Sequence, residues 1–166
     1  MRGDGSSMVG DDHTWGFFPS VSAEWDVKQE CFLSGFDGIN TLKLRTGYGR
    51  SGNLGGISAY TTMNNVQQTG IVPVNNTPTV TLGTIRNNNP DLKWETKSTF
   101  NIGGEIGLWH NRLMLTAEYY YSKTTDMLYS YDVPVPPFAY DKLLANIGAM
   151  SNQGLEIGFS IAPVQT

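Results

Sequence analysis

The chain has 166 residues, a formal net charge of −4 and a charged fraction of 16%, below the quarter or so that is usual for soluble domains. The lack of clustered basic residues argues against nucleic acid or anionic lipid headgroups as the main partner. The single cysteine, Cys31, excludes an internal disulfide framework and a zinc site built on cysteines.

The sequence contains no run of about 18 apolar residues, so we expect no transmembrane helix. Its first residues, Met1 to Ser7, lack the apolar core of a signal peptide. We therefore expect either a cytosolic protein or a chain whose beginning is missing. The many Gly, Tyr, Phe, Trp and Thr residues favour strands and turns over helices.

Five stretches alternate apolar and polar residues with a period of two, which is typical of strands. In the third, for example, Phe100, Ile102 and Ile106 share one side, while Asn101 and Glu105 share the other. We expect the strands, in chain order, at Phe17–Val27, Leu42–Tyr48, Leu92–Trp109, Leu113–Thr125 and about Asn146–Ala162.

The third and fourth strands can be paired through a tight turn at His110-Asn111. If Trp109 lies opposite Arg112, then Ile102 pairs with Tyr119 and the apolar residues of both strands share one face. Thr116, Glu118, Glu105 and Asn101 then share the other face, whereas a slip of one residue would mix the faces.

The expected strands are long. Strands of soluble proteins usually have about 5–6 residues, whereas a strand of about 15 residues is roughly 50 Å long and, tilted by about 40°, crosses a bilayer. Phe100 to Leu108 forms an apolar band of about nine residues, close to what the hydrocarbon core requires. The sequence therefore predicts an all-β fold, an antiparallel transmembrane β-barrel segment whose five or so long strands leave the barrel incomplete.

The expected connections are of two kinds. The turn at His110-Asn111 is short, while the stretch from about Gly49 to Pro90 is a long loop of Asn, Gly, Thr and Pro with one candidate short strand at Ile57–Met63. Barrels of the outer membrane have short periplasmic turns and long extracellular loops, so we expect residues 49–90 to be extracellular. For Lys28–Gly38 we expect one or two helical turns at the periplasmic rim.

Several sequence blocks resemble the SusC/RagA family of TonB-dependent transporters. They are Arg2-Gly3-Asp4-Gly5, Trp15-Gly16-Phe17-Phe18-Pro19, Leu42-Lys43-Leu44-Arg45-Thr46-Gly47-Tyr48-Gly49, Asn89-Pro90-Asp91-Leu92-Lys93-Trp94-Glu95, Thr125-Asp126-Met127-Leu128 and Asn152-Gln153-Gly154-Leu155-Glu156. The blocks follow the family's order and span nearly the whole chain. Met8 and Thr14 depart from the family pattern, as Phe and a basic residue are usual there.

The resemblance implies a multi-pass barrel in the bacterial outer membrane, of the kind found in Bacteroidota. It identifies residues 1–166 as a partial barrel domain, with the plug domain absent. It also implies import of oligosaccharides or peptides, a SusD-like surface lipoprotein as a lid, outer-membrane lipid around the barrel, and the TonB complex acting through the missing plug. A catalytic role and a cofactor are not implied.

Three motifs that could indicate a nucleotide, metal or catalytic site have simpler structural explanations. Gly47 to Gly52 matches the GxGxxG dinucleotide fingerprint, but Asn53-Leu54-Gly55-Gly56 cannot open the helix that this fingerprint requires, so we expect a strand passing into a loop. Asp11-Asp12-His13 is interpreted as a solvated loop rather than a metal site. Glu105 and Glu118 are interpreted as polar residues of a barrel lumen rather than a catalytic pair.

Aromatic residues of the expected loops are the candidate binding residues. They could stack on sugar rings at the mouth of the transporter, or they could pack the loops together or contact the lid lipoprotein. These candidates are Tyr60, Tyr129, Tyr131, Phe138 and Tyr140.

Two functions from different classes remain. The first is a segment of an outer-membrane transporter, and the second is a soluble β-sheet module that binds glycans. The two differ at the sheet edges, because a soluble module must cover or pair its edge strands, whereas a barrel segment leaves two of them open.

Overall fold

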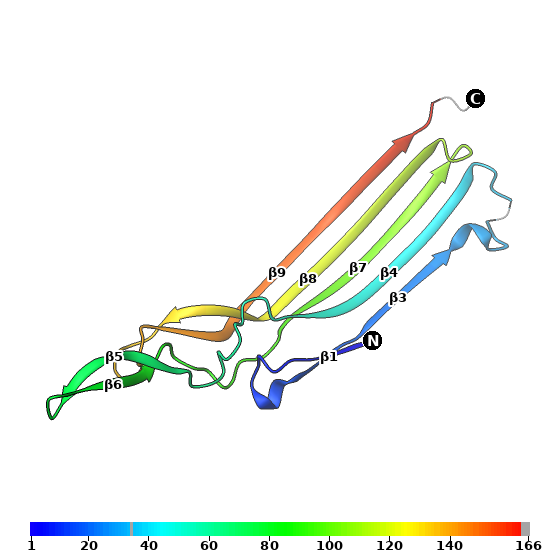
Figure 1. The fold of residues 1–166 in the computed structure, drawn as a ribbon. Helices are drawn as coiled ribbons and strands as arrows, with labels where there is room; N and C mark the ends of the chain where they lie inside the picture. The colour runs from blue at the N-terminus through cyan, green and yellow to red at the C-terminus, as the bar shows by residue number, and fades with distance from the viewer. Residues whose placement is uncertain (34, 164–166) are drawn as a thin grey trace.

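The computed structural model describes residues 1–33 and 35–163. Its main feature is one long antiparallel sheet, shown in Figure 1. The sheet has five strands in the order β3–β4–β7–β8–β9, so β3 and β9 are its edges. The strands are β3 (Ser20–Asp26), β4 (Ile39–Asn53), β7 (Glu95–Leu108), β8 (Leu113–Asp132) and β9 (Lys142–Ile161).

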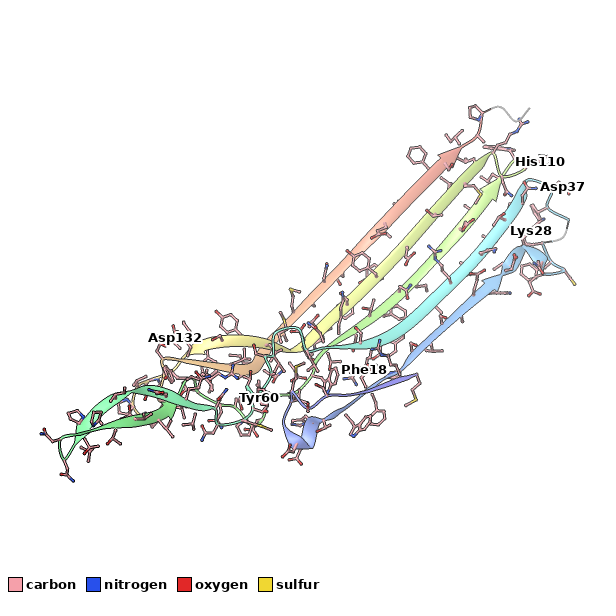
Figure 2. All side chains as sticks on the ribbon, viewed as in Figure 1. Phe18, Lys28, Asp37, Tyr60, His110 and Asp132 are labelled. Atoms are coloured by element: carbon pink, nitrogen blue, oxygen red, sulfur yellow. The ribbon has the colours of Figure 1, made fainter. Side chains whose placement is uncertain are left out.

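The two ends of the sheet differ. Figure 2 shows Lys28, Asp37 and His110 at one end, which we name the turn end, because the β7–β8 turn lies there. Tyr60 and Asp132 lie towards the other end, which we name the loop end. β8 and β9 have 20 residues each and continue past the other strands towards the loop end (Figure 1).

The β7–β8 hairpin has the register that the sequence predicts. Ile102 pairs with Tyr119 and Leu108 with Leu113. The turn residues Trp109, His110 and Asn111 have φ between 51° and 60°, in the left-handed region that Asn tolerates well. This turn chemistry sets the register, and the register places the apolar residues of both strands on one face.

The first expected strand, Phe17–Val27, is wrong as a single element. Residues Trp15–Phe18 form β2, which pairs with β1 (Arg2–Gly5) in a separate two-stranded sheet, and β3 starts only at Ser20. Pro19 separates β2 from β3, because it has no N–H for a strand ladder. Its carbonyl still accepts a hydrogen bond from Arg50 N, at 2.9 Å.

Helical structure is limited to two short 3-10 turns in the described residues, η1 (Asp11–His13) and η2 (Val27–Gln29). The second lies at the start of Lys28–Gly38, where we expected one or two helical turns. The Lys28 ammonium donates to the carbonyls of Leu33 and Phe36 at 3.0 and 2.9 Å, which holds this connection in shape. Nowhere in residues 1–33 and 35–163 is there a helix long and apolar enough to span a membrane.

The region between β4 and β7 is more regular than we expected. β4 continues to Asn53, and a hairpin of β5 (Val66–Val74) and β6 (Thr77–Thr84) follows. The expected short strand at Ile57–Met63 is wrong, because these residues form turns. Asn75 and Asn76 make the hairpin turn with φ of 51° and 63°, as a two-residue turn of the primed type requires.

β8 bends where its pairing with β9 is irregular. The register shifts between Thr124 and Met127, and Asp126 has a φ of 56°. An extra residue of this kind increases the local twist and bends a strand. In Figure 1 the two strands turn away from the main sheet direction at this point.

The buried core lies at the loop end rather than beneath the sheet. Val9, Ile57 and Leu92 form it, with partly buried Met8, Leu54, Trp94, Leu128 and Leu144 packed around them. Gly10 N donates to Leu92 O at 2.8 Å, and a Cβ on Gly10 would overlap the Pro90 carbonyl. This close approach requires glycine and fastens the N-terminal segment to the residues that lead into β7.

Candidate functional site

The five-stranded sheet has one apolar face, which is uncovered. Directly paired residues present their side chains on the same face, so the register defines rows across the sheet. One row consists of Leu44, Gly104, Ala117 and Ile157, and the next towards the turn end of Leu42, Ile106, Leu115 and Phe159. Ile157 is 72% exposed and Phe159 75% exposed. Large apolar residues in such continuous exposure indicate a surface that meets lipid or another apolar partner.

The opposite face is polar and carries a charged network. Arg45 on β4 lies 2.6 Å from the Glu118 carboxylate on β8, across β7. The Asn101 amide also donates to Glu118, at 3.3 Å. Lys43 lies 3.3 Å from Glu24 on the edge strand. These side chains confirm that Asn101 and Glu118 share the polar face.

The acidic residues of the sheet gather on one face. Between the row of Leu108 and the row of Arg50, the acidic residues of the described strands all lie on the polar face, together with Lys43 and Arg45. The polar face is therefore net acidic and suits contact with water or polar groups. Its acidic members are Glu24, Asp26, Glu105, Glu118 and Glu156.

An open pocket of about 470 Å³ lies at the loop end. The Lys93 ammonium is within 2.7 Å of the Asp126 carboxylate, and the Asn146 amide donates to the carbonyls of Lys93 and Asp126 at 2.9 and 2.7 Å. The pocket thus combines fixed hydrogen-bonding groups with the ring of Tyr131. Its lining consists of His13, Asn89, Asp91, Lys93, Tyr131, Leu143, Ala145 and Asn146.

Two asparagine side chains attach this region to β9. The Asn87 amide donates to the carbonyls of Tyr140 and Lys142 at 2.6 and 2.9 Å, and the Asn89 amide donates to that of Leu144 at 2.9 Å. Carbonyls of alternate residues point to the same side of a strand. The two amides therefore donate hydrogen bonds to this part of the chain as the backbone N–H groups of a neighbouring strand would. We name Asn87 and Asn89 the amide ladder.

The five candidate aromatic residues do not gather in one place. Tyr131 lines the pocket, and Tyr129 lies two residues earlier on β8, 62% exposed. Tyr140 instead joins the β8–β9 connection to the end of β6, because its hydroxyl donates to Thr84 O at 2.5 Å. Phe138 belongs to the same connection, and Tyr60 stands in a turn with a φ of 64°. A role in substrate or lid contact stays a prediction for all five.

The remaining pocket residues were not predicted from the sequence. His13 was interpreted as part of a solvated loop, and Lys93 was placed in the expected strand Leu92–Trp109. Asn87 to Asn89 carried a signal, since three amides before Pro90 can replace backbone donors where no strand continues.

At the loop end, Asp132 raises the pKa of Lys142, because its carboxylate accepts a hydrogen bond from the Lys142 ammonium and because its negative charge stabilises the ammonium.

The GxGxxG match takes an ordinary structural role. Gly47 to Gly52, the GxGxxG match, lies inside β4 and opens no helix. Our expectation that these glycines lead the strand into a loop is wrong, because β4 runs on to Asn53. A Cβ on Gly52 would overlap the ring of Phe18. In residues 1–33 and 35–163, no three His, Cys, Asp or Glu side chains are grouped to hold a metal.

A family model described as "TonB dependent receptor-like, beta-barrel" matches residues 1–162. The chain belongs to this family. It is 34% identical over 174 residues to TonB-dependent receptor P26 of Formosa agariphila, covering 99% of this chain and 16% of that protein. It is also 34% identical over 169 residues to TonB-dependent receptor SusC of Bacteroides thetaiotaomicron, covering 100% of this chain and 17% of SusC.

Solved structures give the same result for the fold. The structure of the RagAB peptide importer in the closed-closed state matches 99% of this chain with a TM-score of 0.82 and 27% identity, over 17% of the matched chain. The RagAB peptide transporter matches 95% with a TM-score of 0.77 and 28% identity. The resemblance to SusC/RagA transporters is confirmed, as is the antiparallel fold that is not closed. The chain spans about a sixth of these relatives.

Proposed function

We propose that this chain is one part of the wall of a transporter in the outer membrane, with its apolar face against lipid and its polar face towards the lumen. The family is one of TonB-dependent outer-membrane receptors and transporters. The single observation that carries the proposal is the uncovered apolar face. The edge strands β3 and β9 leave the sheet open, which suits continuation into further wall strands.

The direction of the wall follows from its connections. Short turns of such barrels face the periplasm and long loops face outside. The β7–β8 turn then lies at the periplasmic rim, and the β5–β6 hairpin with the pocket lies at the cell surface. Residues 1–166 are in this proposal a partial barrel domain, and the plug belongs to another part of the protein.

We further propose import of oligosaccharides, or of peptides, with a SusD-like lipoprotein as the lid and energy supplied through TonB. The likeness to SusC supports the first substrate class, and the likeness to the RagAB peptide importer supports the second. Either substrate would find hydrogen-bonding groups in the pocket at Asn89, Asp91 and Lys93, with Tyr131 beside them. Opening the path requires the plug and TonB, and the chain itself makes and breaks no bond.

The soluble glycan-binding module, our alternative, has lost its support. A soluble sheet must cover its apolar face, and Ile157 and Phe159 are instead among the most exposed large apolar residues of the chain. Membership of the receptor family points the same way.

The proposal can be tested with the complete transporter in its native outer membrane. We would measure uptake of labelled oligosaccharides and of labelled peptides in the wild type, in cells lacking the adjacent SusD-like lipoprotein, and in cells lacking TonB. We expect uptake of one substrate class, which is lost without TonB and reduced without the lipoprotein. Uptake that persists without TonB would contradict active transport, and folded protein that fractionates as soluble would contradict the membrane location.

A further inference from the structure

One row of the apolar face carries positive charge. Arg50 pairs with Ser98, Ser98 with Lys123, and Lys123 with Ser151, so these four side chains lie on one face in one row. We name it the cation row. Arg50 and Lys123 are both exposed. Although the sequence has no basic cluster, the register brings together two cations that are 73 positions apart.

The place of the cation row is defined on both sides. Towards the turn end, the next row on this face contains Tyr48, Phe100 and Tyr121, whose rings border the apolar band. Towards the loop end, Phe18 packs edge-to-face with Trp94 at 5.5 Å and covers Gly52 in the next row. The cation row is therefore a narrow exposed strip between the apolar band and a covered region.

The depth of this strip matches a lipid headgroup layer. Tyr side chains at a barrel's membrane border sit at the headgroup level. Two further residues along a strand rise about 6.6 Å, which is roughly 5 Å along the membrane normal for a strand tilted by about 40°. The headgroup layer on each side of a bilayer is about 5–7 Å thick. Because the loop end faces outside in the proposed function, the headgroups concerned are those of the outer leaflet.

The charges of the strip lack a protein counter-ion. Among the described residues, neither Arg50 nor Lys123 makes a salt bridge through its side chain, whereas Lys43, Arg45, Lys93 and Lys142 each do. The rows on either side of the cation row contain no acidic residue. A guanidinium binds phosphate oxygens with two parallel hydrogen bonds, and an ammonium binds them as a point charge.

We propose that the cation row binds phosphate groups of an outer-leaflet lipid. Arg50 and Lys123 are two strand spacings apart, roughly 10 Å, so each contacts a separate phosphate. The hydroxyls of Ser98 and Ser151 supply further donors beside them. This inference rests on the proposed function, because it needs the apolar face in the membrane and the loop end outside.

The experiment uses the complete transporter in nanodiscs of phosphatidylethanolamine, with diphosphoryl lipid A or with dephosphorylated lipid A added. Native mass spectrometry of the released barrel measures retained lipid A as it is titrated. The variants are Arg50→Gln and Lys123→Gln. Lys97→Gln is the matched control, because Lys97 pairs with Thr124, one row from Lys123 but on the polar face.

Each variant of the cation row should weaken retention of diphosphoryl lipid A about fivefold, since a cation near an anionic surface contributes about 1 kcal/mol. Lys97→Gln should leave retention unchanged, and dephosphorylated lipid A should not distinguish the proteins. Equal retention in Lys123→Gln and Lys97→Gln would overturn the inference. So would unchanged retention with altered pairing of barrels, because the row would then bind an acidic protein surface.

Uptake measured on the same proteins separates the two proposals. If the wild type transports its substrate and the cation-row variants keep their lipid, the inference alone fails. If the wild type neither inserts nor transports, the apolar face does not meet lipid and both proposals fail.

Discussion

Leu92 and Ile157 are both aliphatic residues, yet Leu92 is fully buried and Ile157 is 72% exposed. Leu92 lies at the loop end, where it packs with Val9 and Ile57, so that three separate segments meet as in a water-soluble domain. Ile157 lies in the sheet, where nothing in the described chain covers it. The proposed function explains this difference, because the loop end must bury apolar groups from water, whereas a sheet face that meets lipid needs no cover.

Leu92→Ala should have the largest effect, because it leaves a cavity in the only buried cluster that joins the three segments in the described residues. Truncation of a buried leucine costs about 2–5 kcal/mol, so local opening at the loop end should increase about thirtyfold or more. Hydrogen exchange of the complete transporter would measure this. The control is Leu82→Ala on β6, where the side chain is 69% exposed and little should change.

Ile102→Arg tests the apolar face of the five-stranded sheet. A charge on a lipid-facing residue near mid-bilayer costs about 2–4 kcal/mol, so the amount of folded barrel in the outer membrane should fall. Asn101→Arg, one residue away on the polar face, should assemble almost normally and change only uptake. Equal loss of assembly in the two variants would mean that the faces do not meet lipid and water.

Asn87→Ala should have a smaller effect at the loop end. Its side chain makes hydrogen bonds with the carbonyls of Tyr140 and Lys142 and with the N–H groups of Ala139 and Tyr140. Unsatisfied backbone groups that are partly shielded from water cost about 1–3 kcal/mol. Protease sensitivity of the segment after β8 should rise, while Asn88→Ala, the neighbouring control, should leave it unchanged.

Glu118→Gln should have the smallest effect. Exposed ion pairs such as Arg45–Glu118 contribute little to stability, and the Asn101 amide can still donate to the new side chain. The amount of folded barrel should equal that of the wild type at low and high salt. A loss as large as that of Ile102→Arg would show that the polar face depends on this pair for its structure.

The β7–β8 hairpin could be predicted from the sequence because its information is local. Alternation fixes the face of Ile102, and the short turn at Asn111 fixes its partner. The β5–β6 hairpin was missed because Pro73 and Pro78, which pair with each other, resemble breakers, although proline is tolerated in edge strands. Asn75-Asn76 was the available signal for its turn.

The pocket could not be predicted, because its residues come from segments that only the folded loop end brings together. No periodicity connects His13 with Lys93 or Tyr131. The bend of β8 at Asp126 also depends on a bulge, which the sequence analysis did not detect in the alternation of apolar and polar residues. Sequence reasoning therefore located the long strands and the two faces of the sheet, and it placed Tyr131 among the candidates without the groups beside it.

The amide ladder has a consequence for the order of assembly. Asn87 and Asn89 bind carbonyls 53 to 55 residues further along the chain, whereas the β7–β8 hairpin joins neighbours across a turn of a few residues. Closing a long loop costs more chain entropy than closing a short one, and distant contacts form more slowly. We therefore expect the β7–β8 hairpin to form early. The hydrogen bonds of the amide ladder should form late, after β9 has paired with β8.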